Sequence, residues 1–311
     1  MGILSRFPGG VPAPPPINSF LEGKSASSTI YGIAFGNGKF VAVGDKGSAS
    51  YSADGINWFV ATTPSGYTSV SFRSVAFGNG RFVAIGYESG KARAITSTNG
   101  TSWTSVTLSK DAYWHGICYG GNQFVAVGWG CAAYSPDGIT WYNSSAINAY
   151  AYLQAVTYNG SKYVAVAHVT SSGGSNACVM YSTDGINWIA VTPPDAFKTY
   201  EFYGIAYGKG RFIAVGYPSS NISKVMTSTD GIVWEPLIMP YAGKWRTIAY
   251  ADGIFVATCT SSTNDASRIV VSSYGTSWEA LTSPRTSYYG IGYGNGRFVV
   301  GGSLGYTAYS V

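Results

Sequence analysis

Charged side chains are scarce in this chain of 311 residues, since Asp, Glu, Lys and Arg make up only 11% of it. An average soluble domain has about 25%. The net charge of +5 is spread thinly, and the nearest approach to a basic cluster is Lys91 with Arg93. A surface that binds nucleic acid needs a stripe of basic residues. We therefore expect no nucleic-acid partner.

Long apolar runs are also missing. No segment approaches the roughly 20 apolar residues of a membrane span. The first 16 residues, MGILSRFPGGVPAPPP, lack the apolar core of a signal peptide. A myristoylation motif would need Ser or Thr at position 6, which is Arg6. We expect no membrane span, and synthesis in the cytoplasm without a signal peptide.

Potential metal ligands are few as well. The chain has two histidines, and its four cysteines lie in apolar, strand-like runs without metal-ligand spacing. A zinc site requires three or four such ligands. Isolated cysteines in apolar runs are typically buried thiols. No metal site and no cofactor are expected.

What the chain does contain is repeats. One motif of eight residues, ending in Trp, reads YSADGINW at 51–58 and YSPDGITW at 134–141. It returns as YSTDGINW at 181–188 and TSTDGIVW at 227–234, and more loosely as TSTNGTSW at 96–103 and SSYGTSW at 272–278. Asp and Ser can accept backbone N–H bonds within a tight turn, Gly allows its geometry, and Trp supplies a large apolar plate. Catalytic or metal-binding roles fit poorly, because each Asp stands alone, a full repeat from the next. We expect a structural role for Ser52, Asp54, Trp58, Trp103, Asp137, Trp141, Asp184, Trp188, Asp230, Trp234 and Trp278.

A second motif, of the form YGIAFGNGKFVAVG (31–44), occurs seven times. Its copies recur on average about 42 residues apart, and a period of this length made only of strand-like pieces is typical of propeller blades. Asn-Gly and Asp-Gly pairs suit tight hairpins between strands rich in β-branched and aromatic residues. The sequence thus predicts an all-β fold with almost no helix, a seven-bladed antiparallel β-propeller.

The two ends of the chain are expected to complete one blade. The C-terminal TAYSV (307–311) stops where a seventh Asp-Gly turn and fourth strand would follow. INSFL (17–21) aligns with INWFV (56–60), which puts Ser19 in the Trp place and Phe20 in the next. The N-terminal strand should therefore close the last blade, because an unclosed ring would leave an exposed strand edge. This divides the chain into a proline-rich arm, 1–16, and a propeller, 17–311.

The Ser-x-Asp-Gly-x-x-Trp motif resembles a shortened Asp-box, the hairpin of sialidase-like propellers with bacterial neuraminidase repeats. One residue fewer separates Asp from Trp than in that family. The repeat style also resembles phage tail or virion-associated proteins and bacterial surface proteins, and RFPGGVPAPPP resembles a virion-attachment arm. The resemblance implies a propeller and, for sialidases, an arginine triad with a Tyr–Glu pair and an Asp acid.

Those catalytic groups cannot be placed in this sequence. Arg81, Arg211 and Arg297, with Lys39, occupy one equivalent hairpin position and so do not converge. Glycoside hydrolysis needs two carboxylates about 5–10 Å apart. Asp111 and Glu201 could meet in a central funnel, but no spacing requires it. We expect a chain without catalytic residues that is not an enzyme. A sialidase-like glycan hydrolase is the alternative.

The informative positions are those that differ between repeats. The irregular connections carry many aromatics among Ser, Thr and Asn, a composition typical of recognition surfaces. For about half of these aromatics, the alternative is that they pack over the tops of the blades. The full set of aromatics in the irregular connections is Tyr67, Phe72, Tyr113, Trp114, Trp129, Tyr150, Tyr152, Phe197, Tyr200, Phe202, Tyr217, Tyr241, Trp245 and Tyr288.

Seven equivalent positions precede the innermost strands and should form a ring at the channel mouth. They hold Tyr31, Arg73, His115, Gln154, Tyr203, Arg246 and Tyr289. Packing alone does not require aromatic, basic and amide side chains at equivalent positions. A concave binding site, which needs a few converging polar groups, does. Arg73 and Arg246 could hold a carboxylate or phosphate, with the tyrosines as stacking walls. A water-filled mouth without ligand is the alternative.

The sequence therefore predicts a non-catalytic recognition or structural module, associated with a phage virion or tail. Its expected partners are a virion or scaffold protein, docked through residues 1–16, and a cell-surface glycan. A cytosolic protein-interaction scaffold remains a further alternative.

Overall fold

The computed structural model describes residues 17–23, 28–145, 147, 151–169, 179–192, 194, 197, 201–217, 224–239, 243–260, 269–285 and 287–311. Over these residues the chain is built from β-strands, with one 3₁₀ turn, η2 (Ser303–Gly305). The predicted arm, 1–16, lies outside the described residues. No helix in the described part is long and apolar enough to cross a bilayer.

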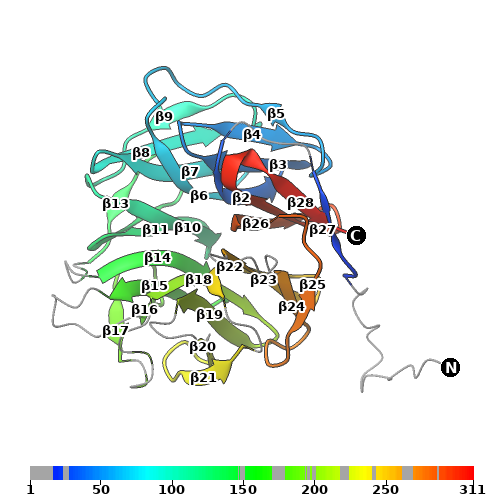
Figure 1. Cartoon of the computed structure of the whole chain (residues 1–311). Helices are drawn as coiled ribbons and strands as arrows, with labels where there is room; N and C mark the ends of the chain where they lie inside the picture. The colour runs from blue at the N-terminus through cyan, green and yellow to red at the C-terminus, as the bar shows by residue number, and fades with distance from the viewer. Residues whose placement is uncertain are drawn as a thin grey trace.

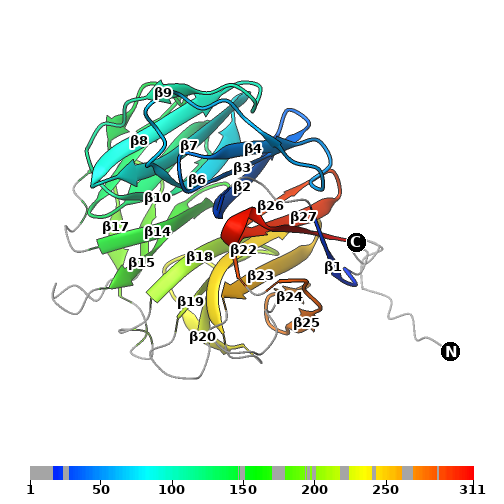
Figure 2. The same ribbon diagram turned by 45° about the horizontal axis from the view of Figure 1, so that its top comes forward.

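Seven four-stranded antiparallel units surround a central channel, so the chain is a seven-bladed β-propeller, as predicted. In Figure 1 and Figure 2 the first strand of each blade lies nearest the channel. The first strands are β2 (Ile30–Gly36), β6 (Ser71–Gly78), β10 (Trp114–Gly120), β14 (Ala151–Tyr158), β18 (Glu201–Gly208), β22 (Lys244–Ala251) and β26 (Tyr288–Gly294). The second strands are β3 (Lys39–Gly44), β7 (Arg81–Glu88), β11 (Gln123–Gly128), β15 (Tyr163–Val169), β19 (Arg211–Tyr217), β23 (Ile254–Thr260) and β27 (Arg297–Gly302). The third strands are β4 (Ala49–Ser52), β8 (Lys91–Ser97), β12 (Cys131–Ser135), β16 (Val179–Ser182), β20 (Lys224–Ser228), β24 (Ile269–Ser272) and β28 (Thr307–Ser310). The fourth strands are β5 (Phe59–Val60), β9 (Thr104–Val106), β13 (Tyr142–Asn143), β17 (Ile189–Val191), β21 (Glu235–Ile238), β25 (Glu279–Leu281) and β1 (Phe20–Glu22).

The turns between first and second strands are tight because their residues accept left-handed backbone angles. Asn37 and Gly38 have φ of 47° and 72°, and Asn295 and Gly296 have 46° and 74°. Two consecutive positive φ angles are what a two-residue hairpin turn requires. These turns and those between third and fourth strands lie on one side of the disc, called here the hairpin face. The opposite side is the cavity face.

The third-to-fourth turns are held by side chains of the repeated motif. Ser52 Oγ accepts the N–H of Gly55 at 2.8 Å, and Asp54 Oδ1 accepts those of Ile56 and Asn57 at 2.9 and 2.8 Å. Burial raises the pKa of Asp54, but the hydrogen bonds from Asn57 and Ile56 outweigh it and hold the pKa well below its usual range. Asp137, Asp184 and Asp230 accept the same pair of backbone bonds.

The core consists of apolar layers between neighbouring blades, and the motif tryptophans lie in them. Trp103 packs with Val41 and Val43 of the preceding blade, and Trp188 packs with Val125. Both are buried, whereas Trp58 is only half-buried. This geometry fits side chains that hold neighbouring blades together. That structural role stays a prediction until the tryptophans are substituted.

Side chains of the hairpin face also link each blade to the next. Asn37 Nδ2 donates to the carbonyl oxygen of Thr98 at 2.9 Å, and Gln123 Nε2 donates to that of Asp184 at 2.7 Å. Asn295 Nδ2 makes the equivalent bond to Ala53 across the closure, at 2.9 Å. The same kind of bond therefore recurs at several of the blade-to-blade contacts on the hairpin face.

The N-terminal strand β1 closes the ring by pairing with β28, as predicted, but one residue out of the predicted register. Phe20 pairs with Ser310, and Leu21 pairs with Tyr309. In the first blade Phe59 pairs with Tyr51, the counterpart of Tyr309. Phe20 therefore takes the Trp place, and the expectation that Ser19 does so is wrong. The reason is burial: Phe20, 3% exposed, fills the interblade layer beside Val256 and Val300, which Ser could not fill.

Candidate functional site

A β-bulge stands at the entrance of every first strand. In the first blade Ile30 pairs with Gly44 and Gly32 pairs with Val43, so Tyr31 has no partner in the ladder. The same irregularity recurs in the other six blades. The skipped residues are the seven predicted ones, named here the cavity ring: Tyr31, Arg73, His115, Gln154, Tyr203, Arg246 and Tyr289. A bulged residue is re-aimed out of the sheet, and here it is aimed at the channel.

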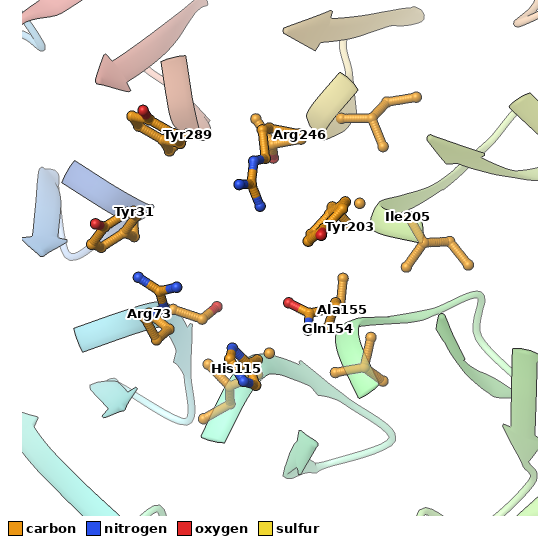
Figure 3. Close-up of a pocket in the computed structure, with 16 residues that line it drawn as sticks. Tyr31, Arg73, His115, Gln154, Ala155, Tyr203, Ile205, Arg246 and Tyr289 are labelled. Carbon is orange, nitrogen blue, oxygen red and sulfur yellow. The ribbon is translucent and has the colours of Figure 1, made fainter. Parts of the chain in front are cut away.

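All seven cavity-ring residues line one cavity of about 360 Å³ (Figure 3). Each of them is half-buried. Below them the wall is formed by small residues such as Gly116 and Ala155 and by branched apolar ones such as Ile117, Ile205 and Ile248. The structure thus brings the predicted residues together, and that they bind a ligand stays a prediction.

Arg73, Tyr31 and Asp45 form one unit in the ring. The Arg73 guanidinium carbon lies 4.3 Å from the Tyr31 ring centre and 5.5 Å from that of Tyr87. The Tyr31 hydroxyl donates to Asp45 Oδ2 at 2.9 Å, and Ser71 Oγ donates to Asp45 Oδ1. Burial and this bond to Asp45 raise the pKa of Tyr31. Stacking on two rings fixes the guanidinium while leaving its N–H groups for other partners.

A second unit of the same design stands in blades five and six. The Arg246 guanidinium carbon lies 4.3 Å from the Tyr203 ring centre and 4.8 Å from that of Tyr217. The Tyr203 hydroxyl donates to Glu201 Oε2 at 2.6 Å. Burial and this hydrogen bond raise the pKa of Tyr203. In both units a carboxylate is engaged by a tyrosine hydroxyl instead of neutralising the arginine.

The two guanidiniums carry the positive charge of the site. Neither forms an ion pair with a carboxylate among the residues that the structure describes. Arg246 Nε is buried and has no hydrogen-bond partner there. A buried donor left unpaired costs about 1–3 kcal/mol. The guanidinium as a whole lines the cavity (Figure 3), where its terminal N–H groups can meet an acceptor.

His115 and Gln154 form the neutral part of the ring. Burial, with the nearby charge of Arg73, lowers the pKa of His115 to about 3. The imidazole is therefore uncharged near neutral pH and can donate one hydrogen bond and accept another. With so low a pKa it is a weak base.

A second tier of varied residues borders the ring, and sequence reasoning did not group it with the ring, although it included Trp129 and Tyr217 among the recognition aromatics. It consists of the residue that follows each second-strand motif, such as Asp45, Tyr87, Trp129 and Tyr217. Tyr87 lies 5.5 Å from the His115 ring, and Tyr217 lies 4.6 Å from the Tyr203 ring. The signal was present, because these positions differ between repeats just as the ring does.

The aromatics of the irregular connections divide into two groups. The fully buried ones, which pack under the blade tops, are Phe72, Trp114, Phe197, Phe202, Trp245 and Tyr288. The half-buried or exposed ones are Tyr67, Tyr113, Trp129, Tyr152 and Tyr217. Tyr150, Tyr200 and Tyr241 lie outside the described residues. Of the rings that the structure describes, only the half-buried or exposed ones can meet a ligand.

Metal and acid–base chemistry have little support in the described residues. No group of three or more His, Cys, Asp or Glu is placed there to hold a metal ion. Burial raises the pKa of the Cys118 and Cys131 thiols to about 12, which makes them poor ligands. Neither Asp111 nor Glu201 is among the residues that line the cavity. Asp111 instead accepts the N–H of Ala92 at 3.2 Å.

No protein-family model and no curated protein sequence matches the chain, so the Asp-box resemblance gains no support from relatives. Solved structures match over nearly the whole chain. "YCF48 bound to D1 peptide" is 16% identical, with a TM-score of 0.71, covering 95% of this chain and 99% of that one. Virginiamycin B lyase from Staphylococcus aureus with quinupristin is 14% identical, with a TM-score of 0.75, covering 94% and 98%. The GH74 xyloglucanase from Xanthomonas campestris is 12% identical, with a TM-score of 0.70, covering 94% and 53%.

These likenesses show the fold alone. They also correct one expectation, since two of the three neighbours are enzymes by name. The prediction that this chain is not an enzyme is therefore wrong as drawn from its architecture. Propellers of this form serve binding in one neighbour and catalysis in others.

Proposed function

We propose that this propeller is a recognition module that binds the acidic group of a glycan in the cavity ring. Arg246 carries the proposal, because its guanidinium lines the cavity (Figure 3) and forms no ion pair with a carboxylate among the described residues. A carboxylate or phosphate oxygen is the acceptor that a guanidinium binds most strongly, by short charge-assisted bonds. Arg73 supplies a second guanidinium in the same cavity.

The rest of the ring fits a sugar that carries this acidic group. Tyr31, Tyr203 and Tyr289 offer flat apolar rings with hydroxyls, and neutral His115 and Gln154 offer further donors and acceptors. A sugar has an apolar C–H face and a rim of hydroxyl groups, so it can use both kinds of partner. A cavity of about 360 Å³ is at the small end of ligand sites, which span roughly 300–1,000 Å³. The ring therefore suits one sugar unit rather than a folded chain.

A glycan array tests the proposal with wild type and the double variant Arg73→Ala/Arg246→Ala. Wild type should retain acidic glycans at least about tenfold more strongly than neutral ones, the ratio given by 1.4 kcal/mol. The double variant should lose this preference at an unchanged Tm. An array on which the two proteins behave alike would remove the cavity ring as the binding site.

The chain offers a matched control for net charge. Arg211 and Arg297 begin β19 and β27 at the hairpin face, at the far end of the strands from the ring. Arg211→Ala/Arg297→Ala removes the same two charges and should keep the preference for acidic glycans. If it loses that preference as well, the effect is long-range charge and not a site.

Two parts of the expected function remain predictions. Association with a phage virion or tail depends on residues 1–16, which lie outside the described residues. Binding of a protein instead of a glycan has a parallel in YCF48, whose structure is described as bound to D1 peptide. A protein ligand would be favoured by two results together. Wild type would bind an acidic peptide and no acidic glycan, and the double Arg variant would no longer bind that peptide.

A further inference from the structure

Four aromatic residues form a continuous row that leads outward from the cavity ring. Tyr87 lies 5.5 Å from His115 and 4.7 Å from Tyr113, measured between ring centres. Tyr113 lies 5.6 Å from Trp129, which stacks on Tyr152 at 4.3 Å with an angle of 19° between the rings. We name Tyr87, Tyr113, Trp129 and Tyr152 the aromatic sector. It spans blades two to four on the cavity face.

The aromatic sector is partly open to solvent. Trp129 is 37% exposed, and the three tyrosines are half-buried. This exposure leaves part of the Trp129 indole accessible to a ligand on the cavity face. The sector is also continuous with the cavity, because Tyr87 touches both Arg73 and His115.

The backbone does not require aromatics at these positions. The N–H of Trp129 donates to the carbonyl oxygen of Tyr113 at 2.9 Å. Equivalent bonds join Asp45 to Thr29 at 3.1 Å and Ser303 to Ser287 at 3.3 Å. The first and seventh blades thus build the same turn from small polar and acidic residues. At these two alignment positions, the described residues place four aromatics in succession in blades two to four, which is a property of the surface and not of the fold.

We propose that the aromatic sector is a subsite for a neutral sugar linked to the acidic sugar in the cavity ring, so that the ligand is an acidic oligosaccharide. This inference rests on the proposed function. The C–H face of a neutral sugar lies flat on an aromatic ring, and the hydroxyls of Tyr87, Tyr113 and Tyr152 can bond its rim. The sector presents half-buried flat rings rather than a deep apolar pocket, which favours a sugar over a peptide side chain. Because the aromatic sector adjoins the cavity, the bound oligosaccharide would have its acidic sugar inside the cavity and its neutral sugars outside, on the sector.

The test compares lengths of ligand on one array. It carries uronic and sialic acid monosaccharides, oligosaccharides with the same acid at the end of a neutral chain, and the neutral chains alone. Wild type should retain the acidic oligosaccharides about tenfold more strongly than the matching monosaccharides, as one good stacking contact allows. Trp129→Ala should reduce the oligosaccharides to the level of the monosaccharides, and leave monosaccharide binding and Tm unchanged. Trp129→Tyr should restore most of the difference.

Tyr142→Ala is the matched control. Tyr142 is an exposed aromatic of the same blade, 49% exposed on the outermost strand β13, and it stacks on Tyr134. Its removal should leave every spot on the array unchanged. If Tyr142→Ala and Trp129→Ala lose equal amounts of oligosaccharide binding, that binding is non-specific adsorption to exposed aromatics, and the subsite is wrong.

The outcomes separate the two proposals. If Trp129→Ala binds oligosaccharides like wild type while Arg73→Ala/Arg246→Ala loses all acidic glycans, the subsite is wrong and the proposed function stands. If wild type retains acidic and neutral chains equally and Trp129→Ala loses both, the acidic cavity site is wrong. Retention of aromatic or proline-rich peptides in place of sugars would overturn both.

Discussion

The hairpin face and the cavity face of the disc are the two ends of the same strands, yet they vary to different degrees. On the hairpin face the same bonds recur from blade to blade, such as those that Asp54 and Asp184 accept from backbone N–H groups of their own turns. On the cavity face the seven equivalent ring positions hold three tyrosines, two arginines, a histidine and a glutamine. Repeated contacts maintain the ring of blades, whereas on our proposal the unrepeated side chains bind a ligand. Substitutions at the hairpin face should therefore change stability, and substitutions at the cavity face should change binding.

The largest effect is expected from opening the ring. Removal of all residues up to position 23 deletes β1, leaves the edge of β28 unpaired and empties the place of Phe20. An unpaired edge strand is a template for aggregation. We expect aggregation or loss of cooperative unfolding, measured by size-exclusion chromatography and thermal melts. A soluble monomer with an unchanged Tm would contradict closure by this strand.

Point variants refine that prediction. Phe20→Ala should cost about 3–5 kcal/mol, as for a buried Phe. Ser19→Ala should change stability by less than about 0.5 kcal/mol. Removal of residues 1–12 alone should leave the Tm unchanged. Equal effects at Ser19 and Phe20 in urea unfolding would contradict the register.

The interblade tryptophans come next. Trp188 and Trp234 are buried, and their Nε1 atoms donate to the carbonyl oxygens of Gly185 and Gly231 at 3.3 and 3.2 Å. Either Trp→Ala variant should lose about 3–5 kcal/mol of unfolding free energy. Trp58→Ala should lose less, because Trp58 is only half-buried and its Nε1 has no partner among the described residues. A folded Trp188→Ala protein of normal stability that had lost glycan binding would break the division between the faces.

His115 should make the stability of the folded protein depend modestly on pH. Its folded pKa of about 3 lies below its ordinary value of 6.5. A depressed folded pKa means stability that is fully present above pH 6.5 and is lost as the pH falls toward 3. His115→Gln should therefore show a smaller drop in Tm between pH 7 and pH 4.5 than wild type. Identical drops in the two proteins would show that His115 is protonated in the folded state.

The smallest effect is expected from Asp54→Asn. Blade two already uses Asn99, whose Oδ1 accepts the N–H groups of Thr101 and Ser102 at 2.9 and 3.0 Å. The change should cost less than about 0.5 kcal/mol near neutral pH. The pKa of Asp54 is depressed, so its contribution is present above the ordinary pKa near 4 and is lost as the pH falls further. The Asn variant should lack this loss in acid melts. Ser52→Ala should cost more, about 1–3 kcal/mol, because it leaves the buried N–H of Gly55 unpaired.

The sequence predicted most of the fold because turns and period are local signals. Asn37-Gly38 and Asp54-Gly55 specify hairpins by their own backbone preferences, and seven copies fix the number of blades. The register of closure was missed because pairing between residues 20 and 310 depends on which side chain fills an interblade layer. Sequence spacing cannot weigh the burial of Phe20 against that of Ser19.

The candidate site was predicted in part for a similar reason. Equivalence between repeats was enough to group Tyr31, Arg73 and Arg246, and the cavity they line required no other information. The units in which Tyr31 engages Asp45, and Tyr203 engages Glu201, were missed because they depend on side-chain directions that a bulge changes. Sequence reasoning included Tyr113, Trp129 and Tyr152 among the recognition aromatics but did not join them with Tyr87 into one sector, because the four come from two different alignment positions in three blades.

The bulge at each ring position has a practical consequence. A residue that takes no part in the ladder can be exchanged without disturbing the pairing of its neighbours. All seven cavity-ring positions are of this kind, and each comes from a separate blade. The propeller could therefore serve as a scaffold for a combinatorial library, in which these seven codons are randomised while the hairpin face is left untouched. Selection from such a library would recover binders to new small ligands at nearly constant thermal stability.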